Sequence, residues 1–282
     1  MKGIRIESYT NEILKIKEIL EEYEDLIQVG ILHELIDDTP YKTENYLKYN
    51  QDNYNVVHNK KKLIDNCIKY YELNPSETGE KIDLFSVIRN RKSVRDYINK
   101  KIPFEDFSNI IFYSFGVKST GRGAYDQKEY PFKYVNSQGG LNYLDLFLFI
   151  NNVESVEQGL YYYDFIGNKI CQMDNGNFRN FLNEIHFQNE FTIYANFVAV
   201  LVADLARVVP KYYKRAYRMA HVDTGIALSY LQIISEYQGV SSCIVAGYLE
   251  HILEDILNLS KSDYPVATMS FGYKSILSKN IW

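Results

Sequence analysis

The sequence has few of the residues that mark metal-binding and disulfide-rich proteins. Among its 282 residues, three cysteines lie far apart without a CxxC pair, and no two of the five histidines stand at metal-ligand spacing on an evident helix face. We therefore expect no metal site. A small, odd number of cysteines suits a reducing compartment, so we expect a cytoplasmic protein. The cysteines are Cys67, Cys171 and Cys243.

Long apolar runs and an excess of positive charge are also lacking. The formal net charge is -5 and the basic residues are spread along the chain, which argues against a nucleic acid partner. No run approaches the roughly 20 apolar residues that span a bilayer, and the opening MKGIRIESYTNEILK contains no apolar stretch of signal-peptide length. We expect neither nucleic acid nor membrane contact.

Several catalytic motifs are missing. The sequence has no GxGxxG after a predicted strand, no GxxxxGK[ST], no GxSxG and no HExxH. Dinucleotide-binding Rossmann, nucleotide-hydrolysing, lipase-like and zinc-protease functions therefore lose their main support.

Tyrosine is abundant where tryptophan is scarce, with 26 tyrosines and one tryptophan. Codon bias in an AT-rich genome explains this composition. An aromatic-lined groove for a peptide or a planar ligand is the alternative.

The N-terminal part differs from the rest. Apolar residues three and four apart predict a helix over 11–29, and residues 33–81 are polar and interrupted by prolines. We divide the chain into a small, mostly helical N-terminal appendage, residues 1–80, and a main domain, residues 81–282.

The main domain mixes helices and strands. Nearly continuous apolar runs at 144–150 and 197–203 are typical of strands buried on both faces, and 117–140 reads as a long loop. We predict an α+β fold around a long central helix. Further strands are expected at 159–164, 241–245 and 265–271, and helices at 84–90, 103–115, 215–237 and 249–257.

The segment from Arg91 to Tyr97, RKSVRDY, gathers three cations and a hydroxyl. Guanidinium, ammonium and hydroxyl donors match phosphate oxygens, although a solvated basic turn has the same composition. The segment resembles the R-[RHK]-S-x-R-x-[FY] signature at the start of nitroreductase-family domains.

Three later stretches extend the resemblance in the family's order. Residues 136–142, NSQGGLN, resemble its P-S-x-G turn with Asn136 in place of proline, and 159–164, GLYYYD, resemble its G-[LV]-Y-x-Y. Residues 210–218, PKYYKRAYR, lead into Asp223-Thr224-Gly225 and are similar to the K-Y-x-x-R-[AG]-Y-R…[DE]-x-G of SagB/McbC-type dehydrogenases, which oxidise azolines in peptide-modifying synthetases. Upstream, His33-Glu34 and Thr39 resemble that branch's F-H-E-x-T.

The resemblance implies a nitroreductase-like FMN-binding fold, with a central mixed sheet flanked by helices, and a homodimer with FMN at its interface. It implies Lys211 and Tyr212 as catalytic residues. The cofactor-binding residues that it implies are Arg91, Lys92, Ser93, Arg95, Ser137, Gly139, Ala246, Gly247 and Lys274.

The implied reaction oxidises thiazoline or oxazoline rings of a precursor peptide, in bacteriocin or cytolysin synthesis, beside cyclodehydratase subunits. FMN takes a hydride and the protein must take a proton. A tyrosine hydroxyl with a pKa of about 10 is a poor base unless a cation favours its phenolate. Lys211 supplies that cation if adjacent side chains converge, which a regular strand would prevent.

Two other functions are compatible with the sequence. One is an NAD(P)H-dependent flavin reductase acting on a nitro group, a quinone or dehydroalanine. The other is a non-catalytic scaffold of a synthetase complex.

Overall fold

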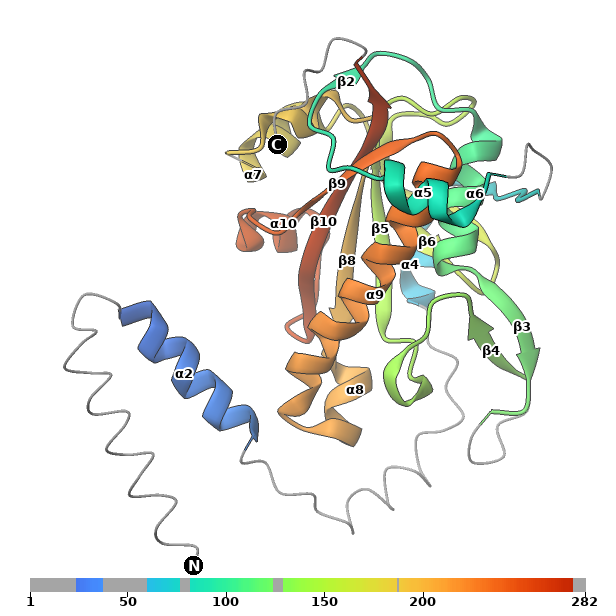
Figure 1. Cartoon of the computed structure of the whole chain (residues 1–282). Helices are drawn as coiled ribbons and strands as arrows, with labels where there is room; N and C mark the ends of the chain where they lie inside the picture. Colours follow the sequence, from blue (N-terminus) through green and yellow to red (C-terminus); the bar gives the residue numbers. More distant parts are fainter. Residues whose placement is uncertain (1–23, 38–59, 77–81, 124–128, 187, 276–282) are drawn as a thin grey trace, which may run out of the picture.

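The computed structural model describes residues 24–37, 60–76, 82–123, 129–186 and 188–275. In this part of the chain, a sheet is covered by helices on both faces (Figure 1). The strand order is β1-β7-β6-β5-β8-β10-β2, and β9 also pairs with β10. The strands are β1 (Lys69–Glu72), β2 (Tyr97–Ile98), β5 (Leu144–Ile150), β6 (Gly159–Asp164), β7 (Lys169–Asn175), β8 (Phe197–Asp204), β9 (Ser241–Val245) and β10 (Asp263–Lys274).

The pairs of named strands are antiparallel. Parallel pairing among the described residues takes the form of two isolated bridges, Ser93 with Ser242 and Ile102 with Val153. The central strands β5 and β8 are buried on both faces almost throughout, as their continuous apolar sequences predict.

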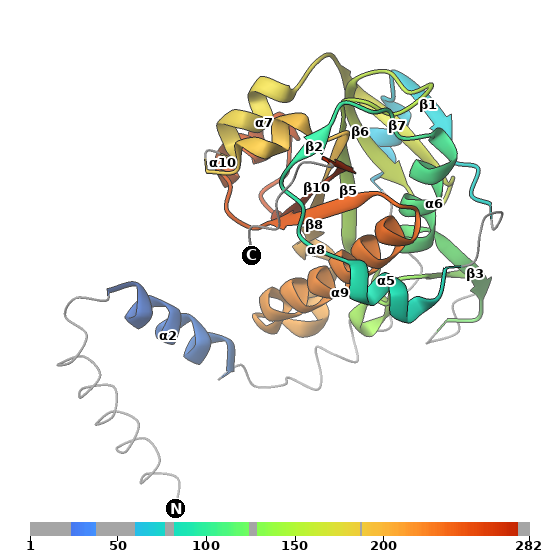
Figure 2. The ribbon, with the colours of Figure 1, turned by 45° about the horizontal axis from the view of Figure 1, so that its top comes forward.

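Different helices cover the two faces of the sheet. The helices of the described residues are α2 (Glu24–Asp37), α4 (Lys61–Asp65), α5 (Leu84–Asn90), α6 (Phe104–Phe115), α7 (Arg179–Ile185), α8 (Leu205–Tyr212), α9 (Arg215–Tyr237) and α10 (Glu250–Ile256), with 3-10 turns η2 (Gln138–Gly140) and η3 (Glu190–Tyr194). Figure 2 shows α9 and α6 on one side of the sheet and α7 and α10 on the other. Each face therefore has its own apolar core.

Alternate side chains of β5 divide between these two cores. Leu146 and Leu148 pack under α6 and α9, whereas Phe147 and Phe149 pack with Leu182 of α7. The α+β architecture predicted from the sequence is confirmed, including the long helix at 215–237. Within the described residues no helix is both long enough and apolar enough to cross a membrane.

The local predictions need correction at four places. The stretch 117–140 contains a separate hairpin of β3 (Val117–Gly121) and β4 (Tyr130–Lys133) as well as η2, whereas a loop was predicted. Polar residues and glycine make up most of β3, and β4 is four residues long and contains a proline, so neither has the longer apolar pattern that identifies a strand. The helix α8 and the strand β7 were not predicted as separate elements, and α2 continues beyond 29.

Part of the proposed appendage joins the sheet. Strand β1 pairs with β7, and Leu73 packs in the core beneath α6 and α9. The division at residue 80 stays a proposal. The appendage so defined includes β1, an edge strand of the main sheet. Thr39 of the F-H-E-x-T resemblance lies outside the described residues.

Candidate functional site

Lys211 and Tyr212 lie at the C-terminal end of α8. The helix begins where the Asp204 carboxylate accepts the Ala206 N-H, and it ends because Tyr213 adopts a positive φ of 53° that cannot continue a right-handed helix. The sequence suggested a turn before a helix at this point. Adjacent residues at a helix end are separated by about 100° around the axis instead of pointing to opposite faces.

The two side chains converge on one glycine. The buried Lys211 Nζ donates a hydrogen bond to the Gly139 carbonyl oxygen at 3.3 Å and lies 5.4 Å from the centroid of the Tyr212 ring. A Cβ atom on Gly139 would collide with the Tyr212 hydroxyl. The ammonium, the phenol and the turn at 137–140 therefore form one cluster.

Both α9 and the turn itself fix the backbone around Gly139. Gly139 and Gly140 each have a φ of 65°, which favours glycine. The Gln138 N-H donates to Asp223 of α9 at 2.8 Å, and the Ser137 hydroxyl accepts the Asn142 N-H at 3.1 Å. Burial raises the pKa of the Asp223 carboxyl, and the hydrogen bond from Gln138 opposes that rise.

Two residues outside the predicted set complete this turn. The Tyr130 hydroxyl donates to the Gly140 carbonyl and accepts from the Asn142 amide nitrogen at 2.9 Å. Asn142 has a φ of 47°, a conformation that asparagine tolerates better than most residues. Neither had a sequence signal beyond its place near the turn.

The predicted phosphate-binding residues gather at the opposite end of α9. Glu236, in the last turn of that helix, lies near both Lys274 and Arg91; burial raises its pKa, and the two cations oppose the rise. Ser93 bridges to Ser242 of β9, and the charge of Arg95 acts on Cys243 of the same strand. Lys92, Ser93, Arg95 and Lys274 are exposed.

Ala246 and Gly247 follow directly after β9 and are both exposed. A Cβ atom on Gly247 would meet nothing within 4 Å, so the position that a side chain would occupy is open space. The buried Thr268 hydroxyl oxygen lies 3.0 Å from the Val245 carbonyl oxygen. Since C=O and N-H point in opposite directions in a trans peptide, the Ala246 N-H is directed away from the core.

A single chain does not bring all the predicted site residues together. The turn at Gly139 is attached to Asp223, whereas Arg91 and Lys274 of the basic cluster lie near Glu236. These two positions are thirteen residue steps apart along α9, about 20 Å at a rise of about 1.5 Å per residue.

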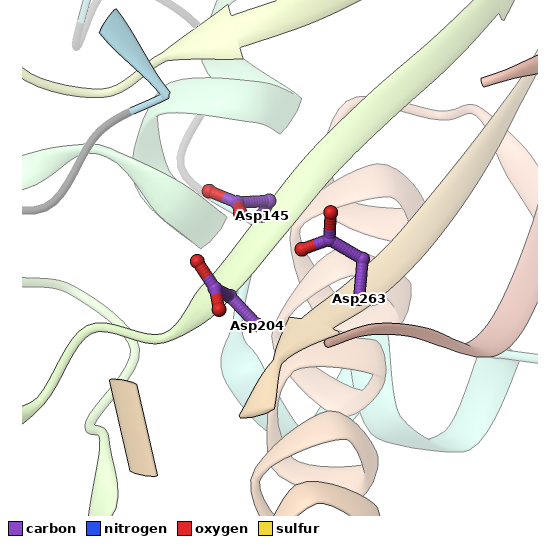
Figure 3. Close-up of side chains that lie close together, drawn as sticks. All are labelled: Asp145, Asp204 and Asp263. Atoms are coloured by element: carbon purple, nitrogen blue, oxygen red, sulfur yellow. The ribbon is translucent and has the colours of Figure 1, made fainter. Parts of the chain in front are cut away.

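A cluster that the sequence did not indicate lies at the start of α8. The carboxylates of Asp145, Asp204 and Asp263 come from three neighbouring strands and face one another (Figure 3), with oxygens within 4.8 Å. Cations already contact all three: Lys60 lies among them, and Arg207 binds Asp145 and Asp204. Each of these aspartates is 59 residues from the next in sequence, and the strand register alone brings them together.

The chain is similar to known proteins over most of its length. Residues 88–273, more than half of the chain, match the nitroreductase family. A Methanocaldococcus jannaschii protein described as a nitroreductase is 25% identical over 195 residues, which cover 69% of this chain and 93% of that protein.

Two solved structures share the fold. One is a nitroreductase from Anabaena variabilis, with a TM-score of 0.63 and 19% identity over 81% of this chain; the match spans about half, 47%, of that longer protein. The other is the Escherichia coli microcin synthetase McbBCD complex with truncated pro-MccB17 bound, with a TM-score of 0.53, 18% identity, and coverage of 81% of this chain and 86% of that chain. The chain therefore belongs to the nitroreductase family and is an oxidoreductase of that family.

Proposed function

We propose that this protein is an FMN-dependent azoline dehydrogenase, which oxidises thiazoline or oxazoline rings of a precursor peptide to azoles. The observation that carries the proposal is the convergence of the Lys211 ammonium and the Tyr212 phenol on the Gly139 turn. A buried cation beside a phenol is the arrangement that makes tyrosine able to accept a proton near neutral pH.

The residues present fit FMN. Arg91, Ser93, Arg95 and Lys274 offer charged and hydroxyl donors for a phosphate at one end of β9. The Ala246 N-H and the open space at Gly247 lie at the other end, and the four residue steps from Ser242, which Ser93 bridges, to Ala246 span about 13 Å along a strand. This separation suits a cofactor with its phosphate at one end and its ring at the other.

When bound, FMN would supply the acceptor for the hydride that leaves the azoline ring. The protein must remove the second hydrogen as a proton. Tyr212 is the residue placed to take this proton at its hydroxyl oxygen, and Lys211 stabilises the phenolate by its charge. The hydrogen bond from Lys211 to the Gly139 carbonyl holds the ammonium in place, and the absent side chain of Gly139 lets the phenol reach the turn.

We further propose that the enzyme is a cytoplasmic homodimer that works beside cyclodehydratase subunits. The fold likeness to the microcin synthetase complex supports a peptide substrate and partners of this kind. The appendage, residues 1–80, is the candidate for binding those partners.

The decisive experiment follows the mass of the precursor peptide after co-expression with its cyclodehydratase. Wild type should remove two hydrogens, about 2 Da, per ring. Tyr212→Phe and Lys211→Ala should keep FMN bound and slow ring oxidation by about 100-fold or more, the usual contribution of a positioned base.

Tyr213→Phe is the matched control, because the buried Tyr213 hydroxyl has no hydrogen-bond partner among the described residues. It should retain wild-type activity. Wild-type protein that holds FMN and leaves azolines unoxidised would overturn the dehydrogenase proposal. If NAD(P)H then reduces the bound flavin, the protein is a flavin reductase. If NAD(P)H does not reduce it, the protein is a scaffold.

A further inference from the structure

Two cations, Lys60 and Arg207, form ion pairs with the three carboxylates of the aspartate cluster. Asp145 is fully buried at its side chain, and its pKa is raised by burial, with the charges of Arg207 and Lys60 opposing the rise. Lys60 Nζ lies 2.5 Å from Asp263, 3.7 Å from Asp145 and 3.8 Å from Asp204. By these distances the ammonium lies among all three carboxylates, whose arrangement Figure 3 shows.

Arg207 is the second cation of this cluster and is also buried. Its guanidinium donates to both Asp145 oxygens, at 3.0 and 3.3 Å, and to Asp204 at 3.0 Å. A third cation, Lys133, interacts electrostatically with Asp145, but its Nζ lies over the rings of Phe115 and Phe165 at 4.3 and 4.6 Å.

Arg207 connects the cluster to the proposed catalytic pair in two ways. It lies one helical turn before Lys211 on α8, so its ion pairs fix the helix that carries Lys211. Its Nη1 also donates to the Asn142 carbonyl at 3.0 Å, and the Asn142 N-H binds Ser137 of the turn. One guanidinium therefore holds both the helix and the turn.

Lys60 belongs to a different part of the chain. It is the N-cap residue of α4, within the proposed appendage, and its backbone N-H donates to the Tyr162 hydroxyl, which itself donates to Asp145. Without its ammonium, three carboxylates would face Arg207 with one charge fewer to balance them. Arg207 would then be drawn toward Asp263 and away from the Asn142 carbonyl.

We propose that Arg207 and Lys60 are positioning residues: Arg207 sets the distance between α8 and the Gly139 turn, and Lys60, from the appendage, holds Arg207 in place through the shared aspartates. The catalytic meaning of this role rests on the proposed function. The positions of the side chains can nevertheless be tested without any substrate.

The test measures how fast an amine-acetylating reagent modifies Lys211 in the folded, full-length, FMN-loaded protein, read residue by residue by mass spectrometry. Lys60→Met should increase the Lys211 rate by about tenfold, because a charged hydrogen bond shifts a local opening equilibrium by at least that factor. The control is Lys62→Met, two residues along on an exposed position of α4, which should leave the rate unchanged.

A double variant separates charge from packing. Lys60→Met with Asp263→Asn removes one cation and one carboxylate together, so the Lys211 rate should return toward wild type. The proposal falls if Lys60→Met leaves the Lys211 rate unchanged, or if Lys60→Met and Lys62→Met raise it equally. It also falls if every buried lysine is modified faster, which would indicate general loosening of the fold. If Lys211 responds as expected and wild type oxidises no azoline, the positioning role stands and the proposed function falls.

Discussion

Gly139 is the residue on which the geometry of the proposed site depends most directly. Its φ of 65° and its contact with the Tyr212 hydroxyl both require the absence of a Cβ atom. Gly139→Ala should therefore destabilise the protein by about 1–2 kcal/mol through the backbone alone. It should also displace the phenol and lower azoline oxidation toward the level of Tyr212→Phe, measured as oxidation rate per FMN-loaded chain.

Gly239→Ala separates these two effects. Gly239 has a φ of 71°, and a Cβ there would meet nothing within 4 Å. Urea unfolding should show a similar loss of stability in both variants, with activity lost in Gly139→Ala only. Equal activity in the two variants would mean that Tyr212 need not approach this turn.

At the scale of elements, His186 attaches the end of α7 to β10. Its ring nitrogens contact the Leu182 carbonyl at 3.1 Å and the Thr268 hydroxyl at 2.8 Å. Burial lowers the pKa of His186 from 6.5 to about 4, and the hydrogen bond to Leu182 opposes the shift. The folded state therefore binds this proton less readily than the unfolded state does. The stability that neutral His186 provides is complete above about pH 6.5 and is lost as the pH falls toward 4.

Urea unfolding measured at about pH 7.5 and about pH 5 tests this effect, which should amount to about 2 kcal/mol over that interval. His186→Gln should lose less stability on acidification than wild type. His251→Gln, at an exposed position of α10, should keep the wild-type dependence. The same pH dependence in His186→Gln would show that other groups cause the loss.

At the scale of the whole molecule, α9 separates the basic cluster from the Gly139 turn. Exposed apolar side chains lie nearby: Leu84, Phe85 and Ile88 of α5, which contacts α9, are between 51% and 69% exposed. Apolar surface of this kind is typical of protein interfaces. It supports the proposed homodimer, in which the cluster of one copy could face the turn of the other.

Complementation tests whether one site uses two copies. Arg95→Ala should impair cofactor binding and Lys211→Ala should impair chemistry. Co-expressed together, they should recover about a quarter of wild-type activity, because half of randomly formed dimers are mixed and each mixed dimer has one intact site. No recovery, although mass measurement shows mixed dimers, would mean that each site is built from a single chain.

Much of the fold follows from local sequence. Continuous apolar runs are sufficient to identify β5 and β8, and the helix over 215–237 has the bounds that its pattern predicted. The hairpin β3–β4 and the helix α8 escaped prediction because polar residues and Pro210 obscure their periodicity. Family motifs identified the segments of the candidate site without placing them relative to one another.

The sequence by itself determined the family, the main elements and the candidate residues, since these depend on residue type and short-range spacing. Only the tertiary structure decided that Lys211 and Tyr212 meet at Gly139, because the answer depends on a helix ending at Tyr212 and on a turn 72 residues away. It also decided that Asp145, Asp204 and Asp263 share Lys60 and Arg207. Such clusters arise from strand register and packing, and no local pattern encodes the long-range contacts that create them.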